Sequence, residues 1–116
     1  MSDEQATAAA VRKSVFDPGA TVLVTLGGPR EKFWGVLLEV SPAGISLRGL
    51  DLNSFDDFVH LVRSGEPASP AAVFFPMHRV ERMEADEHCG DIPSLKERFQ
   101  EKTGRPLAYL FGRYGE

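Results

Sequence analysis

Apolar and polar residues alternate with a period of two in several short stretches of the chain, a pattern typical of β-strands with one buried face. Residues 21–27 are the first such stretch, with Val22, Val24 and Leu26 on one face. Residues 33–40 (FWGVLLEV) are apolar on both faces. This second stretch is therefore predicted to be a strand covered from both sides.

Two of the predicted strands carry a glycine in their interior, where a strand normally has a side chain to pack. Gly35 lies within residues 33–40 and indicates a bend or a close approach of another backbone segment. In residues 44–52 the apolar side chains change face at Gly49, which fits a β-bulge with one extra residue. Bends in two neighbouring strands favour a small barrel over an open sheet.

Helical periodicity replaces the strand pattern in two places. Four apolar residues at i, i+3, i+4 and i+7, starting from Phe55, form one stripe. Ser54 is the expected N-cap there, and with Asp57 it resembles a capping box in which Asp replaces Glu. Ser94 and Glu97 match the capping box itself before a second helix.

These patterns predict a mainly β fold with a minor α component and seven elements. The predicted strands are residues 21–27, 32–41, 44–52, 72–76 and 79–85, and the predicted helices are residues 54–64 and 94–103.

The chain has 116 residues, a length that predicts one domain. A domain of this size buries roughly two-thirds of its unfolded surface, enough for a core without metals or disulfides. Residues 1–16 are Ala-rich and predicted to be a flexible segment, or a short helix where it is covered. Residues 17–92 are predicted to form the barrel with its inserted helix, and residues 93–116 a helix and an apolar tail.

The charge and the cysteine content limit the classes of function. The net charge is −4 and the sequence pI about 5.4, so no overall positive field attracts nucleic acid. Cys89 is the only cysteine, so no internal disulfide forms. No secretion signal is visible at the N-terminus, and no stretch approaches the ~18 apolar residues of a membrane span. We therefore expect a cytoplasmic protein without a membrane partner.

Pro76 and the tetrapeptide Met77-His78-Arg79-Val80 form a very tight corner between the last two predicted strands. The tetrapeptide is similar to the lysine–histidine–alanine–isoleucine corner of bacterial members of the Sm-like (LSm) family, with Met77 in place of the lysine. Five short, strongly bent strands and Gly35 in the second strand also resemble that family over residues 20–86. The resemblance implies a small five-stranded antiparallel Sm-like barrel, with the helix at 54–64 as an insertion, and a non-enzymatic, RNA-binding function.

Met77, His78 and Arg79 are the candidate RNA-binding residues. A histidine ring can stack on or hydrogen-bond an unpaired base, and a guanidinium group can stack or bind phosphate. The structural alternatives are that His78 caps the corner or packs beside Phe75, and that Arg79 pairs with a neighbouring acid such as Glu81.

Residues 86–91 (DEHCGD) hold the main concentration of metal-capable side chains. Structural zinc sites use separated Cys/His pairs, and consecutive residues point in different directions, so a solvated linker is the favoured interpretation. His88 beside Cys89 lacks the spatial arrangement of a thiol nucleophile and its base. We expect no enzyme activity, no metal, no cofactor and no small-molecule substrate.

Residues 107–114 are unusually apolar for the end of a chain. They are expected to dock on the barrel, on a second subunit or on another protein. Two functions follow from the sequence. One is an RNA-binding module that uses the Met77–Arg79 corner, and the other is a homo-oligomeric or protein-interaction module without nucleic acid.

Overall fold

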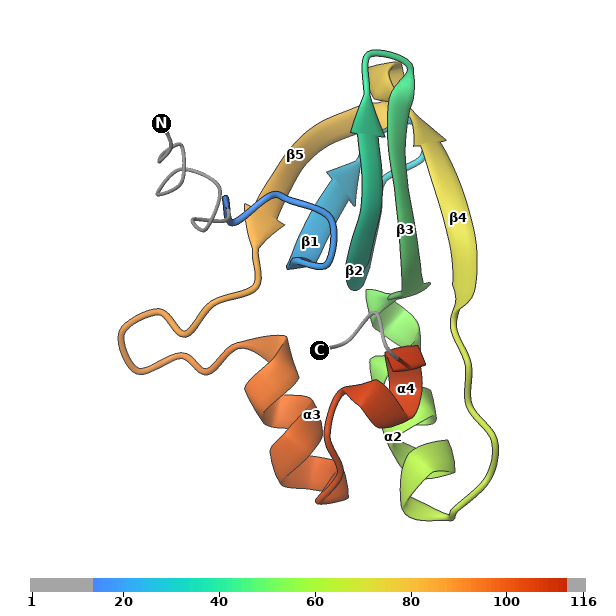
Figure 1. Ribbon diagram of the computed structural model, residues 1–116, viewed down its shortest axis with the longest axis vertical. Helices are drawn as coiled ribbons and strands as arrows, with labels where there is room; N and C mark the ends of the chain where they lie inside the picture. The colour runs from blue at the N-terminus through green and yellow to red at the C-terminus, as the bar shows by residue number, and fades with distance from the viewer. Residues whose placement is uncertain (1–13, 113–116) are drawn as a thin grey trace, which may run out of the picture.

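The computed structural model describes residues 14–112 and shows a sheet of five strands with helices at one end (Figure 1). The predicted flexible segment therefore lies almost wholly outside the described residues. The strands are β1 (Thr21–Leu26), β2 (Glu31–Ser41), β3 (Gly44–Asp51), β4 (Ala71–Pro76) and β5 (Val80–Ala85). The helices are α2 (Phe55–Arg63), α3 (Leu95–Thr103) and α4 (Ala108–Phe111), with 3-10 turns η1 (Leu52–Ser54) and η2 (Met77–Arg79).

The sequence prediction of a mainly β fold with five antiparallel strands and two longer helices is confirmed. The bounds of each predicted strand differ from those of the observed strand by at most one residue. The short α4 was not predicted, because four helical residues are too few to show a period. No helix within residues 14–112 has the length and apolar character needed to cross a membrane.

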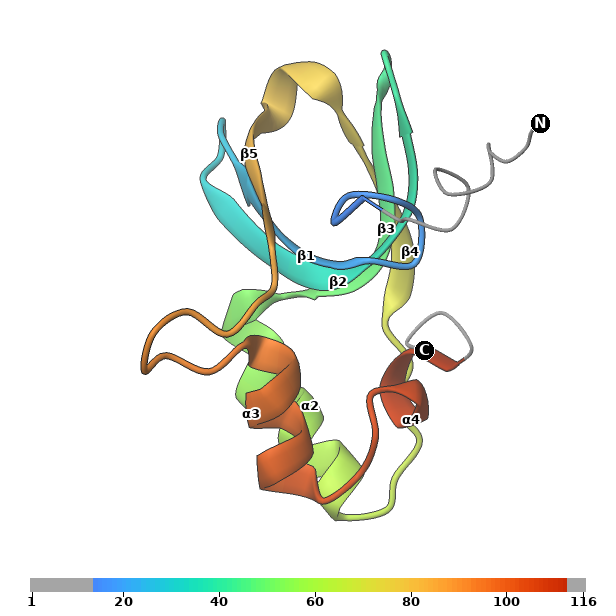
Figure 2. The same cartoon turned by 60° about the vertical axis from the view of Figure 1, so that its left-hand side comes forward.

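The sheet is open, so the predicted closed barrel is not seen. Its strand order is β4-β3-β2-β1-β5, with antiparallel neighbours throughout. Figure 2 shows the sheet bent into a trough, with β1 and β5 on one wall and β3 and β4 on the other. β4 and β5 are joined by η2 at the rim but do not pair, and they remain the two edges.

An inner core fills the trough. It consists of buried side chains that alternate along each strand and all point to the concave face: Val22, Val24, Leu26, Leu37, Ile45, Leu47 and Phe75. Phe33 packs against Phe75 with ring centroids 4.9 Å apart. This face accounts for the period-two pattern in the sequence, because only one side of these strand segments lies in the trough.

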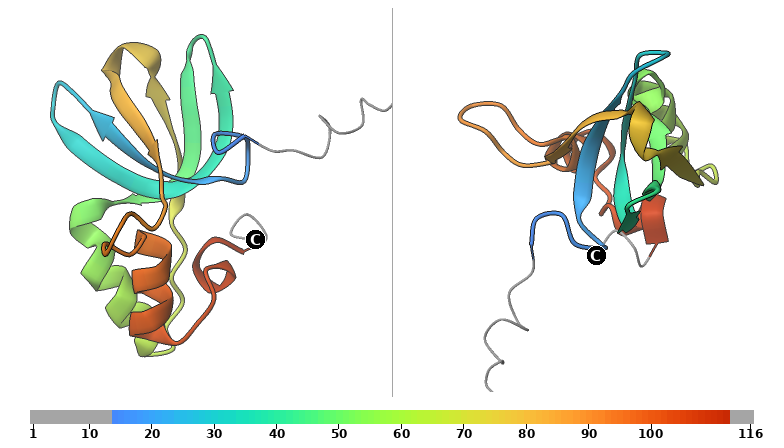
Figure 3. Two further views of the ribbon diagram at one scale, coloured as in Figure 1. Left: turned by 90° about the vertical axis from the view of Figure 1, so that its left-hand side faces the viewer. Right: turned by 90° about the horizontal axis from the view of Figure 1, so that it is seen from above.

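An outer core lies between the convex face of the sheet and the helices, at the end away from the rim (Figure 3). Trp34 is fully buried at its centre, with Phe55 and Phe111 at centroid distances of 5.5 and 5.4 Å. Phe99 of α3 packs on the same ring at 6.3 Å. The two-sided apolar character of residues 33–40 thus reflects two different cores, one on each face of β2.

Gly35 and Gly49 lie directly opposite each other in β2 and β3, in a part of the pair where the register is regular. A Cβ on Gly49 would lie 2.7 Å from the carbonyl oxygen of Trp34, and one on Gly35 would lie 2.6 Å from the Cα of Gly49. The predicted bulge at Gly49 is therefore wrong, whereas the predicted close approach at Gly35 is observed. Apolar residues change face at Gly49 because β3 passes from the inner core to the outer one. The register shift in this pair falls between Leu37 and Glu39.

The helix ends follow the sequence signals in α3 but not in α2. The Ser94 hydroxyl accepts from the backbone N–H of Glu97, and the Glu97 carboxylate accepts from the N–H of Ser94, so the capping box is formed. Ser54 makes no capping bond to α2, because η1 precedes that helix and Asp51 caps η1 instead.

Candidate functional site

The β4–β5 corner is held between two other turns at the rim of the trough (Figure 3). The Met77 N–H donates to the carbonyl of Ala43 in the β2–β3 turn at 2.9 Å. The Gly27 N–H of the β1–β2 turn donates to the carbonyl of Arg79, also at 2.9 Å. Three loops far apart in sequence are therefore fixed side by side, opposite the helices.

Met77 and His78 project from this corner into solvent. Met77 is exposed, and so is His78. A side chain on a rigid, solvent-facing corner is accessible to a ligand. The interpretation of these two residues as RNA contacts remains a prediction.

Arg79 instead binds the β1–β2 turn. Its Nε donates to the carbonyl of Gly27 at 3.0 Å and its Nη2 to the carbonyl of Pro29 at 2.7 Å. The same Nη2 lies 2.9 Å from the Glu31 carboxylate, so the acidic partner is Glu31 and not the neighbouring Glu81. A phosphate group would have to compete with these contacts, and RNA binding by Arg79 also remains a prediction.

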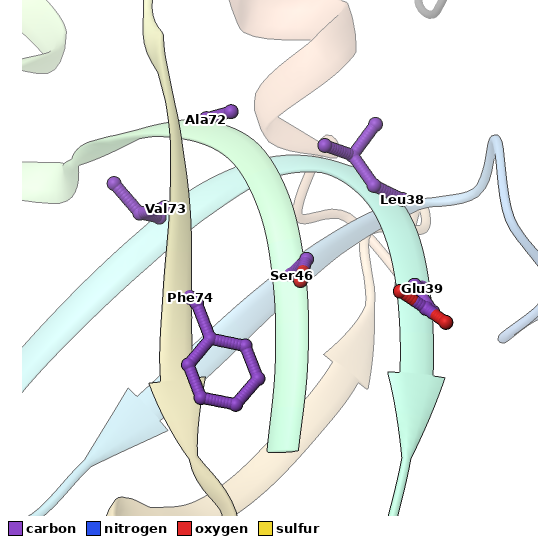
Figure 4. A pocket seen from close by; sticks show the side chains of 6 residues that line it. All are labelled: Leu38, Glu39, Ser46, Ala72, Val73 and Phe74. Carbon is purple, nitrogen blue, oxygen red and sulfur yellow. The ribbon is translucent and has the colours of Figure 1, made fainter. Parts of the chain in front are cut away.

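A groove of about 580 Å³ runs along the edge strand β4 beside the corner. Its lining residues are Leu38, Glu39, Ser46, Ala72, Val73 and Phe74 (Figure 4). Glu39, Ser46 and Phe74 are cross-strand neighbours on the convex face. The Phe74 side chain is 53% exposed.

A second, basic groove of about 240 Å³ lies on the other wall of the trough. Its lining residues are Thr25, Arg30, Lys32, Glu81 and Arg82. Thr25 is buried, whereas the charged residues around it are exposed. This cluster was not predicted from the sequence, because its members come from three separate segments.

The loop between β5 and α3 is organised by Asp86. Its Oδ2 accepts from the Trp34 indole Nε1–H at 3.0 Å and from the backbone N–H of Lys96 at 2.9 Å, and its Oδ1 accepts from the N–H of Leu95 at 2.8 Å. This carboxylate joins the sheet to the start of α3. Its role was not predicted, because the indole and the carboxylate lie 52 positions apart.

His88 in the same loop pairs with Glu97 at 2.9 Å. The hydrogen bond to the Glu97 carboxylate, followed by its charge, raises the pKa of His88 above its ordinary value. Hydrogen bonding from the Ser94 backbone, followed by that from His88, lowers the pKa of Glu97. Both side chains are exposed, and their partners are those of a loop anchor rather than of a catalytic base.

Cys89 is exposed and pairs through its backbone with Ile92. Within residues 14–112, no three His, Cys, Asp or Glu side chains converge to hold a metal ion.

Only part of the apolar tail lies among the described residues. Leu107, Leu110 and Phe111 are buried in the outer core of their own chain. Tyr109 is exposed and stacks with Arg105, whose guanidinium lies 4.4 Å from the ring centroid. Residues 113–116, which include Tyr114, lie outside the described part.

No family model, curated protein or solved structure matches the chain.

Proposed function

We propose that this protein is a non-enzymatic, Sm-like module of the cytoplasm that self-assembles through the two unpaired edges of its sheet. The observation that carries the proposal is the open strand order, in which β4 and β5 each pair on one side only. Unpaired backbone N–H and C=O groups along an edge strand are a template for pairing with another strand. The five bent strands, Gly35 and the tight corner before Val80 support the Sm-like part of the proposal.

The side chains at the two edges favour strand pairing between copies. On the concave face, Val73 of β4 and Val80 and Met83 of β5 are only partly buried. If β4 of one copy pairs with β5 of another, these residues continue the inner core across the junction. On the convex face, the same pairing covers the exposed ring of Phe74.

Light scattering on the full chain tests the proposal. The wild-type protein is expected to have a mass that is a multiple of the 12.8 kDa chain mass. Phe74→Lys places a charge on the edge strand, where Lys blocks pairing in natural sheets, and shifts the mass toward 12.8 kDa. Because Phe74 is exposed, this variant keeps its fold, which circular dichroism verifies.

Ile92→Lys is the matched control. Ile92 is 70% exposed and lies in the loop between β5 and α3, outside both edge strands. This variant is expected to assemble as the wild type does. A wild-type protein that stays at 12.8 kDa at every concentration would contradict self-assembly, and an unchanged assembly of Phe74→Lys would contradict the use of the β4 edge.

RNA binding is the second candidate function, favoured by the solvent-facing Met77 and His78 on a rigid corner. Single-stranded RNA is recognised by stacking and hydrogen bonding to splayed bases, which a fixed, exposed ring can provide. Fluorescence anisotropy with U-rich and A-rich RNAs at low salt tests this function. The absence of binding at micromolar protein concentration would contradict it.

A further inference from the structure

Three residues form a straight row across the wall of the trough that contains β5. Thr25 of β1 is the register partner of Lys32 on β2 and of Arg82 on β5. Neighbouring strands lie about 4.8 Å apart, so the two cationic residues flank Thr25 with a Cα separation of about 10 Å. Lys and Arg side chains are long enough to reach a common ligand over the small threonine.

This row faces outward. The residues before and after it in sequence, such as Val24, Phe33 and Met83, belong to the inner core, and side chains alternate along a strand. Lys32 and Arg82 are exposed, while Thr25 forms the floor of the basic groove at 7% exposure.

The balance of charge over the groove is positive. Arg30 joins Lys32 and Arg82 at its border, and Glu81 is the acidic residue in the lining. Arg82 forms an ion pair with Glu84, two positions along the strand. Exposed ion pairs of this kind are worth little, so a phosphate can take the place of the Glu84 carboxylate.

Arg79 adds to the local excess of positive charge by pairing with a neighbouring acidic residue. It holds the carboxylate of Glu31, the acidic residue between Arg30 and Lys32 in sequence, at 2.9 Å. Glu31 is thereby neutralised within the fold. Although the chain has a net charge of −4, the groove brings several cationic side chains together on the sheet.

From these observations we propose that the basic groove binds the phosphate backbone of single-stranded RNA. Lys32 and Arg82 contact phosphate oxygens, Arg30 adds a third cation, and the Thr25 hydroxyl donates a hydrogen bond from the floor. No described residue that lines the groove is aromatic, so the site offers no platform for base stacking and binds without sequence preference. The proposal rests on the second proposed function, RNA binding, but uses residues other than the corner.

Fluorescence anisotropy with labelled U-rich and A-rich RNAs, over a series of salt concentrations, tests the site on the full chain. In the double variant Lys32→Gln/Arg82→Gln, affinity for both RNAs is expected to fall about tenfold at low salt. The slope of log binding constant against log salt becomes shallower by about 1.4, since each phosphate contact on a single strand contributes about 0.7.

Two further variants complete the design. Arg63→Gln/Lys102→Gln removes one exposed Arg and one exposed Lys from the last turns of α2 and α3, so it matches the change in net charge at the helical end. His78→Ala removes the exposed corner ring. Thermal unfolding of each variant verifies that the fold is kept.

Loss of affinity in the groove variant, with wild-type affinity in the helical control, supports the site. Equal losses of affinity in the groove variant and in the helical control would show that only net charge matters, and would overturn the proposed site. Unchanged affinity in the groove variant, with loss in His78→Ala, overturns the site but upholds RNA binding at the corner. A wild-type protein that binds neither RNA overturns both proposals.

Discussion

At the scale of single residues, Asp86 joins the sheet to α3 through three hydrogen bonds. One carboxylate accepts from a buried indole and from two backbone N–H groups at the start of α3. A negative charge at a helix N-terminus is also favoured by the helix dipole. The side chain therefore satisfies a donor in the outer core and fixes where α3 begins.

Asp86→Ala is expected to lower the free energy of unfolding by about 3 kcal/mol. The variant loses hydrogen bonds to a charged acceptor and leaves the Trp34 N–H buried without its partner, a combination that is costly. Urea unfolding followed by tryptophan fluorescence measures the change, and Trp34 is the only tryptophan in the chain.

Asp91→Ala is the control for this variant. Asp91 is an exposed carboxylate in the same loop, and its removal is expected to change stability by less than about 0.5 kcal/mol. Equal destabilisation by the two substitutions would show that the loop's charge, and not the bond to Trp34, is what matters.

At the scale of elements, the shape of the sheet depends on the close approach of the paired strands β2 and β3 at their glycines. Gly35 and Gly49 face each other on the concave side, where the two backbones leave no room for a Cβ. On the opposite side of the same strands, Trp34 and Leu50 enter the outer core. The inner core therefore lies on the concave face of these strands, and the outer core with the helices lies on the convex face.

Gly35→Ala is expected to destabilise the protein by about 3 kcal/mol, because the new methyl group overlaps the backbone of Arg48 and Gly49, which cannot move independently. Gly27→Ala is the matched substitution. A Cβ there meets the side chain of Glu81, which is exposed and flexible, so a loss below about 0.5 kcal/mol is expected. Thermal or urea unfolding compares the stabilities of the two variants. Similar losses of stability would contradict the role assigned to the close approach of β2 and β3 at Gly35.

At the scale of the whole molecule, local patterns in the sequence predicted the elements, and long-range contacts determined what they build. Alternation located the strands, and Ser94 with Glu97 located α3, because these signals arise from neighbouring residues. The open sheet was not predicted, because mid-strand glycines indicate that strands bend but not whether the two edge strands come close enough to pair. Phe74 and the basic groove were also missed as sites, because alternation alone does not reveal which strand becomes an edge.

Three apolar side chains in the described part of the tail are covered by the chain's own sheet and helices. Leu107, Leu110 and Phe111 share one core with Trp34 of β2 and with α2 and α3. Side chains of β2 and of the three helices therefore meet around one indole. It follows that the buried side chains in the described part of the tail stabilise the fold and are not exposed for binding a partner.

Phe111→Ala tests this conclusion. Phe111 is 2% exposed and packs edge-on against Trp34, so its truncation leaves a cavity in the outer core and is expected to cost about 4 kcal/mol. Tyr109→Ala removes an aromatic ring from the same short helix, but one that is 36% exposed and packs on Arg105, so a loss of about 1 kcal/mol is expected. Urea unfolding of the two variants measures the difference. If Phe111 served a binding partner and not the core, the isolated chain would tolerate both substitutions equally, and tryptophan emission in Phe111→Ala would be that of the wild type.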